Sequence, residues 1–343
     1  MVSNFINQYF EDFKYYINKY GEKTILLIRV GDFYESYAES KECVLYPYIV
    51  NYADQLDFAI KQLKDKIMTG FPFYTLEKHV NTLLKHNFVV IVFEQVKDNN
   101  DTVIERKLSD IYTPGTHLDT VTKDDKELLS IYIDIYSYQN QKIYEISVCK
   151  INICTGKNYI YEIEPKVNDI NYSLDELYKF VHSSNAAEII INITNKDEYN
   201  SVINFLNIKD LYYKIYEPEL NFKNVNCQKE FLDDIFNNNT QLDIFNYLNI
   251  DEFKGNGGRI AYILLLLYIK DNNKVLLNNI NLPLVYQENF NMILTKNAIK
   301  RLNILTDQHN KGVFDIVNFT NTIMGKRELK KRILYPIFNK DEL

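Results

Sequence analysis

The chain has 343 residues, of which 46% are hydrophobic and 25% are charged, with 10 Gly and 7 Pro. This composition excludes a disordered or low-complexity scaffold, and the length predicts about two or three units that can each bury a core. The formal net charge of −7 excludes a protein that coats nucleic acid through its overall charge, so any contact with DNA must be local.

The cysteines and the two ends of the chain bear on its compartment. Residues 1–16 include acidic side chains and no continuous apolar core, so they do not resemble a secretory signal. The last residues, Lys340 to Leu343, spell KDEL, which is a retention signal only behind such a peptide. The four cysteines show no metal-ligand spacing and are expected to be reduced: Cys43, Cys149, Cys154 and Cys227. We therefore expect an intracellular protein, cytoplasmic or nuclear.

The first predicted elements are a helix and a strand. Apolar residues three and four positions apart predict a helix over residues 4–20, which Gly21 ends. The apolar run Thr24–Ile28 then predicts a buried strand that delivers Phe33 and Glu35 to a surface. Because these two side chains are two positions apart in extended backbone, we expect them to share a face.

The next segments predict a mixed sheet with helices over residues 1–118. The expected elements are a short helix at 37–45, strands at 57–61 and 66–70, a helix at 76–86, and strands at 88–93 and 102–112. Residues 119–126 (DTVTKDDK) are polar and charged, which predicts a hinge between units.

A different pattern begins after the hinge. The expected elements are strands at 128–138, 143–152 and 159–163, a helix at 173–183, a buried strand of the parallel type at 188–192, and helices at 228–248 and 258–270. The helix at 258–270 is apolar nearly all round, yet it is too short to span a membrane. We therefore expect a buried core helix and no membrane partner.

Residues 29–35, RVGDFYE, resemble the mismatch-reading motif of the MutS family of DNA mismatch repair proteins, whose Phe-x-Glu follows an Arg-Met-Gly-Asp segment. The resemblance continues in the family's order along the chain. It runs through 68–74 (MTGFPFY), 93–96 (FEQV), 105–107 (ERK), 113–116 (TPGT) and 315–332 (DIVNFTNTIMGKRELKKR). The chain thus resembles the amino-terminal portion of a MutS protein.

This resemblance implies an α/β fold with three domains and one linker. These are a mixed-sheet MutS domain I at 1–118, a linker at 119–127, a ribonuclease H-like α/β connector at 128–250, and the all-α start of the core and lever domain at 251–343. Residues 46–52 look like an insertion into domain I. The connector is not catalytic in the family, and Asp134 stands alone at the predicted strand core, so we expect no nuclease site. A family-like Asp-x-Ser-x-Gly site reads NICTG at 152–156.

The resemblance also implies roles for Phe33 and Glu35. In the family this Phe is a wedge in the minor groove, and this Glu hydrogen-bonds the mispaired base stacked on it. A wedge is favourable only where a base step is already weak, since unstacking costs a few kcal/mol. Beside phosphates the carboxylate is unfavourable unless it finds a base-edge donor or takes a proton, so it would also repel ordinary duplex.

Further DNA-binding residues follow from the same motifs. The family's loop beside the kinked DNA corresponds to Met68, Phe71, Pro72 and Tyr74, where Tyr74 replaces a usual Arg or His and so weakens one ionic contact. The candidate phosphate contacts are Arg29, Arg106, Lys107, Lys78 and Lys85. For a single Lys or Arg a solvated surface position is the default expectation, except at Arg106, which lies in the family's Glu-Arg motif.

No catalytic residue, cofactor or metal is expected in this chain. Gly325-Lys326 lacks the upstream Gly and the following Ser or Thr of a phosphate-binding loop, and the five histidines form no hydrolytic motif. The resemblance assigns ATP, Mg and the ATPase domain to the part of the family protein beyond these residues. We therefore expect a protein that is not itself an enzyme.

The expected function is recognition of double-stranded DNA with a mismatch or loop. The alternative is a non-catalytic protein-interaction module of a repair complex, in which DNA reading is vestigial. A protein partner is also expected, either a MutS-like carboxy-terminal ATPase polypeptide or a second copy. The reason is an apolar face on the last helix that would otherwise be exposed, so truncation after about Leu277 is expected to improve solubility. That face comprises Leu329, Ile333, Leu334, Ile337 and Phe338.

Overall fold

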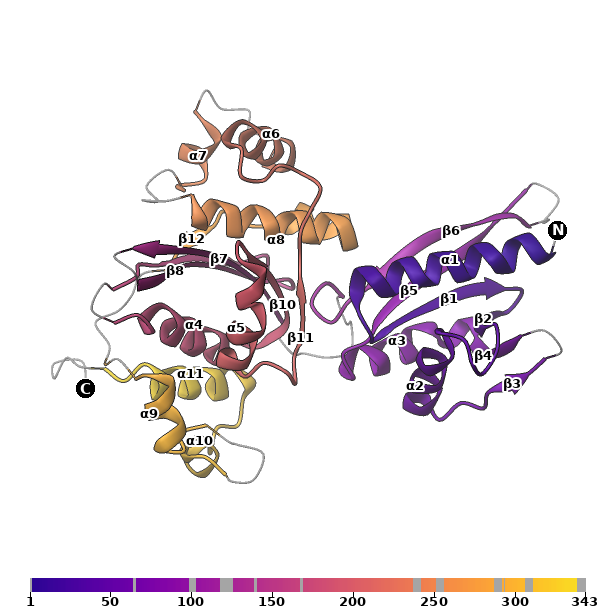
Figure 1. Cartoon of the computed structure of the whole chain (residues 1–343), viewed down its shortest axis with the longest axis horizontal. Helices are drawn as coiled ribbons and strands as arrows, with labels where there is room; N and C mark the ends of the chain where they lie inside the picture. The colour runs from indigo at the N-terminus through magenta and orange to yellow at the C-terminus, as the bar shows by residue number, and fades with distance from the viewer. Residues whose placement is uncertain are drawn as a thin grey trace. The chain divides into compact units, whose positions relative to one another are not determined.

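A computed structural model describes residues 2–63, 66–98, 103–117, 126–138, 141–166, 169–236, 242–250, 256–286, 292, 294–305 and 311–337. The chain forms two compact units (Figure 1). The first comprises Met1–Asp119 with Asp271–Asn273, and the second comprises Thr120–Lys270 with Lys274–Leu343. Each unit holds one six-stranded sheet. Residues 119–125 of the expected linker at 119–127 lie outside the described residues.

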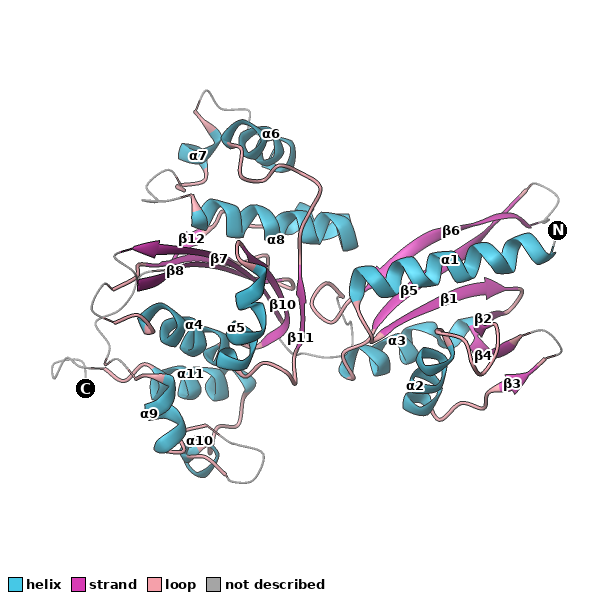
Figure 2. Cartoon of the chain, viewed as in Figure 1, coloured by secondary structure: helices cyan, strands magenta, loops and turns pink. Residues whose placement is uncertain are grey.

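The first unit is a mixed sheet with helices on both faces (Figure 2). Its strand order is β3-β4-β2-β1-β5-β6, and only the β1–β5 pair is parallel. The strands are β1 (Thr24–Val30), β2 (Phe33–Ala38), β3 (Lys61–Gln62), β4 (Ile67–Pro72), β5 (Val89–Lys97) and β6 (Val103–Tyr112). The helices are α1 (Val2–Tyr20), α2 (Tyr46–Leu56) and α3 (Leu76–Lys85), with a 3-10 turn η1 (Phe73–Thr75).

The pairing of β5 with β6 is irregular at two places. The register shifts between Val92 and Phe93 and again between Val96 and Lys97. Such bulges bend a strand and increase its twist. As a result β6, which lies at one edge of the sheet, does not run flat along its neighbour.

Two predictions for the first unit are wrong. Residues 37–45 are not a helix, because β2 continues to Ala38, and the helix begins later with α2. The expected insertion at 46–52 is the first part of α2, whose first turn holds Pro47 and whose inner side buries Ile49 and Tyr52. The expected strand at 57–61 is also absent, because Asp57 takes a left-handed conformation (φ +55°) that ends α2.

The second unit has the α/β order expected of a ribonuclease H-like connector. Three antiparallel strands are followed by a helix, a parallel strand, a helix and a further parallel strand, in the sheet order β11-β10-β7-β8-β9-β12. The strands are β7 (Glu127–Tyr138), β8 (Gln141–Asn152), β9 (Asn158–Ile163), β10 (Ala186–Ile193), β11 (Tyr212–Ile215) and β12 (Leu284–Val285). The helices between them are α4 (Tyr172–Ser183) and α5 (Tyr199–Leu206), and η2 (Lys196–Glu198) precedes α5.

Both faces of this sheet are buried. On one face lies α8 (Gly257–Asn273), which is buried on every side from Ile260 to Ile269 as predicted, with α6 (Val225–Phe236) and α7 (Ile244–Tyr247) beyond it (Figure 1). The predicted helix at 228–248 is therefore two helices, and residues 237–241 lie outside the described ones. Among the described residues no helix is long and apolar enough to cross a membrane.

The other face is covered by α4 and α5, and α4 is covered in turn by the last helices. These are α9 (Lys296–Arg301), α10 (Val313–Val317) and α11 (Ile323–Leu334). Leu334 is fully buried with α4, and Ile333 packs against the same cluster. The expected uncovered apolar face is therefore wrong for Ile333 and Leu334, whereas Leu329 and Ile337 are half-buried. Phe338 lies outside the described residues.

Candidate nucleic-acid interface

Phe33 lies at the tip of a tight hairpin. Val30 of β1 pairs with Phe33 of β2, so Gly31 and Asp32 alone make the turn. Gly31 has φ +59°, a conformation that glycine adopts at no steric cost and that matches the twist of two-residue hairpins. The Phe33 side chain remains 47% exposed. The fold therefore presents a large aromatic ring at a rigid corner.

Glu35 follows on the same face of β2, as predicted. It lies opposite Gly70 of β4, and the Tyr37 hydroxyl donates a hydrogen bond to its Oε2. A Cβ atom at residue 70 would clash with the carbonyl oxygen of Tyr34 and lie 3.2 Å from Cγ of Glu35. Gly70 thus makes room for the carboxylate, and burial together with Glu35 raises the pKa of Tyr37, which keeps that donor protonated.

Tyr9 of α1 fixes the inner end of the hairpin. The β1–β2 ladder pairs only the residues nearest the turn. Beyond them the Tyr9 hydroxyl accepts a hydrogen bond from the Tyr37 backbone N–H (3.0 Å) and donates to the Leu26 carbonyl (3.0 Å). It also lies 2.8 Å from Oγ of Ser36. A side chain from another element therefore sets the spacing of the two strands that carry Phe33.

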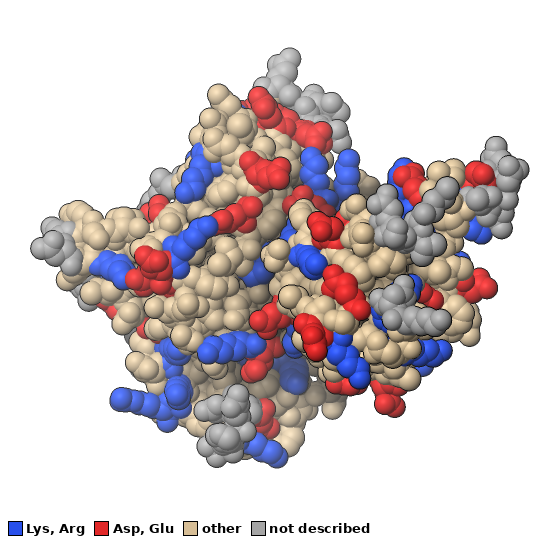
Figure 3. All heavy atoms as spheres, turned by 45° about the vertical axis from the view of Figure 1, so that its right-hand side comes forward, with Lys and Arg blue, Asp and Glu red and all other residues tan. Residues whose placement is uncertain are grey.

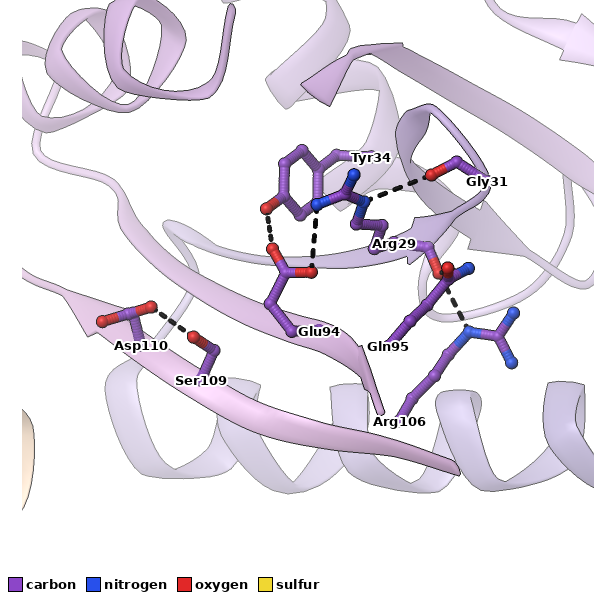
Figure 4. A network of polar contacts seen from close by, with 8 residues as sticks. All are labelled: Arg29, Gly31, Tyr34, Glu94, Gln95, Arg106, Ser109 and Asp110. Atoms are coloured by element: carbon purple, nitrogen blue, oxygen red, sulfur yellow. Dashed lines mark hydrogen bonds and ion pairs between the residues drawn. The ribbon is translucent and has the colours of Figure 1, made fainter. Parts of the chain in front are cut away.

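Arg106 lies on the same face as Glu35. Its Nε donates to the Arg29 backbone carbonyl (2.9 Å), which also accepts from Nε2 of Gln95 (3.0 Å; Figure 4). The guanidinium carbon is 4.3 Å from the centre of the Phe5 ring. Burial lowers the pKa of Arg106, while Tyr37 and Glu35 oppose that shift. A positive charge is thus held within the electrostatic influence of the carboxylate.

Arg29 and Lys107 lie on the opposite face, because each is adjacent in its strand to a residue of the Glu35 face. The Arg29 Nη1 atom is 3.4 Å from Oε2 of Glu94, whose other oxygen accepts from the Tyr34 hydroxyl (Figure 4). The Lys107 ammonium is 2.7 Å from Glu105. These partners offset both charges, so each is expected to contribute less to phosphate binding than an uncompensated cation.

The predicted loop residues divide between surface and core. Met68 pairs with Tyr37 and Pro72 with Phe33, so both lie on the Glu35 face. Tyr74 is 77% exposed on η1. Phe71, which was predicted to contact DNA, is only 2% exposed because it packs against Tyr34 and His79. Phe71 therefore lies in the core against these two side chains and supports the surface loop from below rather than forming part of the surface.

The charges around the interface are mixed. On the face shown in Figure 3, basic and acidic side chains are interspersed over the first unit. Lys78 and Lys85, also predicted as phosphate contacts, are exposed on α3, away from the Glu35 face. A ligand would therefore meet local features rather than a broad positive field.

Sequence reasoning missed the residues that hold this arrangement. Tyr37 donates to the Glu35 carboxylate, whereas Tyr9 bonds backbone groups of β1 and β2 and Gln95 donates to the Arg29 carbonyl that Arg106 also contacts. Gly70 and Gln95 lie inside the quoted motifs, so the motifs themselves carried a signal for them. For Tyr9 the sequence carried no signal beyond its apolar position in a helix, because its hydrogen-bond partners are determined only by how α1 packs on the sheet.

In the second unit Asp134 does not stand alone. Glu145 lies directly opposite it on β8, and burial together with Asp134 raises the pKa of Glu145. Thr194 donates a hydrogen bond to Asp134 (2.9 Å). Even so, within the described parts of the chain no three His, Cys, Asp or Glu side chains converge as a metal site would require.

Known proteins match this chain along nearly all of its length. A putative DNA mismatch repair protein mutS homolog of Acanthamoeba polyphaga mimivirus is 30% identical over 98% of the chain and 33% of its own length. The DNA mismatch repair protein MutS of Petrotoga mobilis is 26% identical over 93% of the chain and 36% of its own. A mitochondrial DNA mismatch repair protein mutS homolog of Sarcophyton glaucum is 27% identical over 98% and 39%.

The chain spans about a third of the length of these curated relatives. A family profile described as MutS domain I matches residues 4–121, which cover the first sheet with its hairpin and all three of its helices. The order of motifs, the fold of both units and these matches agree with one another, and the chain therefore belongs to the MutS family.

Proposed function

We propose that the Glu35 face of the first unit binds double-stranded DNA containing a mismatch or a loop. The observation that carries the proposal is Phe33, a half-exposed ring on a rigid hairpin two residues from a carboxylate. Phe33 would insert at a weakened base step, and Glu35 would accept a hydrogen bond from the displaced base. This is a recognition function, with duplex DNA as the partner.

The wedge discriminates through the deformability of the DNA. Inserting a ring unstacks a base step at a cost of a few kcal/mol, and a mispair lowers that cost. Because Phe33 is already exposed at a turn fixed by Gly31, the protein needs no large rearrangement to insert it. The preference for mispaired DNA should therefore come from the lower free-energy cost of unstacking a mispaired step. We expect this preference to be modest.

Glu35 adds selectivity through its charge. A carboxylate near phosphates is unfavourable unless a donor meets it. Tyr37 donates to Oε2 of Glu35, so Oε1 would accept a hydrogen bond from a donor on the edge of an extruded or mispaired base. An intact duplex would offer no such donor and would be repelled.

The phosphate contacts in this proposal come from both sides of the sheet. Arg106 is the strongest candidate because it shares the face of Glu35 and Phe33. Met68 and Pro72 line the same face, whereas Tyr74, Arg29 and Lys107 would reach a backbone that passes around the hairpin end. These phosphate contacts are few, which agrees with the net negative charge of the chain.

Phe33→Ala is the first test. The unchanged chain should bind a mismatched duplex about tenfold more tightly than homoduplex, in the range expected for one aromatic–base stack. The variant should lose this preference and keep the weak, salt-sensitive background. Tyr15→Ala removes another exposed ring, on α1, and should keep the preference. Equal loss of affinity on both DNAs in Phe33→Ala would contradict the wedge.

Glu35→Ala tests the second role. If the carboxylate repels ordinary duplex, the affinity for homoduplex should rise in the variant while discrimination falls. A fall in affinity on every DNA would count against that role. A wild-type chain that does not distinguish the two DNAs at any salt concentration would instead favour the alternative of a protein-interaction module.

A further inference from the structure

The second unit contains a cavity that the proposed function does not use. It has a volume of about 360 Å³ and lies where the β8–β9 turn, the end of α4 and the last turn of α11 meet. This volume is within the usual range for small-molecule sites. The turn is the segment 152–156, singled out above as a family-like motif without a role.

The cavity is positively charged within an acidic chain. Its charged lining consists of Lys150, Lys157 and Lys331 with the single carboxylate of Glu127, an excess of two positive charges (three minus one). Lys150 is 3.2 Å from Glu127, and the other oxygen of Glu127 accepts from the Asn185 backbone N–H (3.0 Å). Glu127 is thus fixed by two donors, and Lys150 is held in place at the cavity wall.

Aromatic rings form another part of the wall: Tyr159 and Tyr286 are half-buried, whereas Phe180 is only 2% exposed and offers little surface. The Lys150 ammonium is 5.5 Å from the centre of the Tyr159 ring and 5.4 Å from that of Phe180. Lys157 is 5.4 Å from the Tyr159 ring. Cations held beside ring faces keep their position at a modest cost in side-chain entropy. The cavity therefore offers both positive charge and flat apolar surface.

The polar turn at the cavity is rigid. Oδ1 of Asn152 accepts a hydrogen bond from the Thr155 backbone N–H (3.0 Å). Gly156 has φ +70°, and a Cβ atom there would overlap the carbonyl oxygen of Asn279 at the end of η3 (Lys274–Asn279). Packing against η3 thus requires glycine. The Asn152 and Thr155 side chains, which line the cavity, are held at defined positions.

We propose that this cavity binds a nucleoside phosphate, either a free nucleotide or the phosphorylated end of a DNA strand. The lysines would neutralise the phosphate, and the half-buried rings of Tyr159 and Tyr286 would stack on the base. The site differs from a phosphate-binding loop, since it is made of side chains and not of a cradle of backbone amides. Binding and not hydrolysis is therefore expected. The site is independent of the DNA-reading face of the first unit.

Titration calorimetry of the full chain tests this with dTMP, thymidine and inorganic phosphate. We expect dTMP to bind, and thymidine and phosphate to bind at least about tenfold more weakly. Lys157→Glu with Lys331→Glu should weaken dTMP binding by about tenfold or more, because both side chains are exposed and their reversal inverts the local charge. Lys209→Glu makes the same change at an exposed position away from the cavity and should have no effect.

Oligonucleotides that differ only in a 5′-phosphate or a 5′-hydroxyl separate the two sources of the ligand. A preference for the phosphorylated end that disappears in the double variant supports a DNA end, and dTMP binding alone supports a free nucleotide. Absence of binding by dTMP and by phosphorylated DNA at millimolar concentration would overturn the proposal. So would binding that the double variant leaves unchanged, or phosphate that binds as tightly as dTMP.

Discussion

The two six-stranded sheets differ in how far their own units cover them. In the second sheet β7 has six consecutive buried residues, and clusters of apolar side chains lie on both faces. In the first sheet β6 is largely exposed, and the hairpin ends in an exposed ring. This contrast indicates where a ligand can bind, because only side chains that a unit leaves uncovered are accessible to it. Substitutions should therefore separate into effects on stability and effects on DNA binding.

The largest effect should come from Leu334→Ala in the second unit. Leu334 is fully buried against α4, so its truncation should lower the free energy of unfolding by about 2–5 kcal/mol, as for other buried leucines. Urea unfolding measures this, and DNA discrimination at low temperature should be unchanged. Met324→Ala in the same helix is the control, since Met324 is 72% exposed and its loss should cost little. A Leu334 variant as stable as the parent would restore the idea of an uncovered helix.

The second effect depends on pH. Burial lowers the pKa of His182 to about 4, while Nε2 lies 2.8 Å from the Leu206 carbonyl. As the pH falls from about 6.5 to 4 the unfolded chain takes up this proton first, so the free energy of unfolding should fall by up to about 3 kcal/mol. Below pH 4 His182 adds no further loss. His182→Gln should flatten this part of the profile, and an identical slope in the variant would exclude His182 as its source.

In the first unit Tyr9→Phe should have a mixed effect. It removes the hydroxyl that joins the Leu26 carbonyl to the Tyr37 N–H and leaves both buried groups without that partner. We expect a loss of about 2 kcal/mol in the free energy of unfolding, and weaker discrimination of mismatched DNA because the hairpin spacing is no longer fixed. Tyr15→Phe, at an exposed position, should change neither property. Unaltered discrimination in Tyr9→Phe would mean that the hairpin holds its shape without α1.

The smallest effect on stability should come from Lys107→Met. Lys107 is exposed and paired with Glu105, so the free energy of unfolding should stay within about 0.5 kcal/mol. Binding to homoduplex and mismatched DNA should weaken equally, and the slope of affinity against salt should fall by less than about one, because Glu105 already offsets part of the charge. Arg106→Met should in contrast reduce discrimination, because Arg106 shares the face of Glu35. If both variants changed DNA discrimination equally, the assignment of Arg106 and Lys107 to functionally different faces of the sheet would be contradicted.

Much of the fold follows from local pattern. The apolar runs that form β1, β5 and β10 are continuous and short, which is the pattern of a strand buried on both sides. The helix at α8 follows from its all-round apolar composition. Burial at Phe71 could also have been derived, because alternation along β4 buries Ile67, Thr69 and Phe71 in turn. The predicted strand stopped at Gly70, one residue too early to show it.

Other features depend on contacts that no local pattern contains. The segment at 46–56 is rich in tyrosine, which suits a strand as well as a helix, and burial of Ile49, Tyr52 and Ala53 decides for the helix. The cover of Leu334 comes from α4, far away in the sequence. At the candidate site the motifs supplied Phe33 and Glu35, whereas the Tyr9 hydrogen bonds that set the spacing of β1 and β2 arise only when α1 packs on the sheet.

The irregular pairing of β6 bears on how the protein behaves in concentrated solution. An outer strand of ten residues presents unpaired backbone groups that can recruit a strand from another molecule. The two register shifts twist it away from a flat template, and the charged side chains of Glu105, Arg106, Lys107 and Asp110 stand along it. The cations proposed to meet DNA thus also keep copies of the protein from adding strand to strand. Removing these charges together would promote aggregation as well as weaken DNA binding.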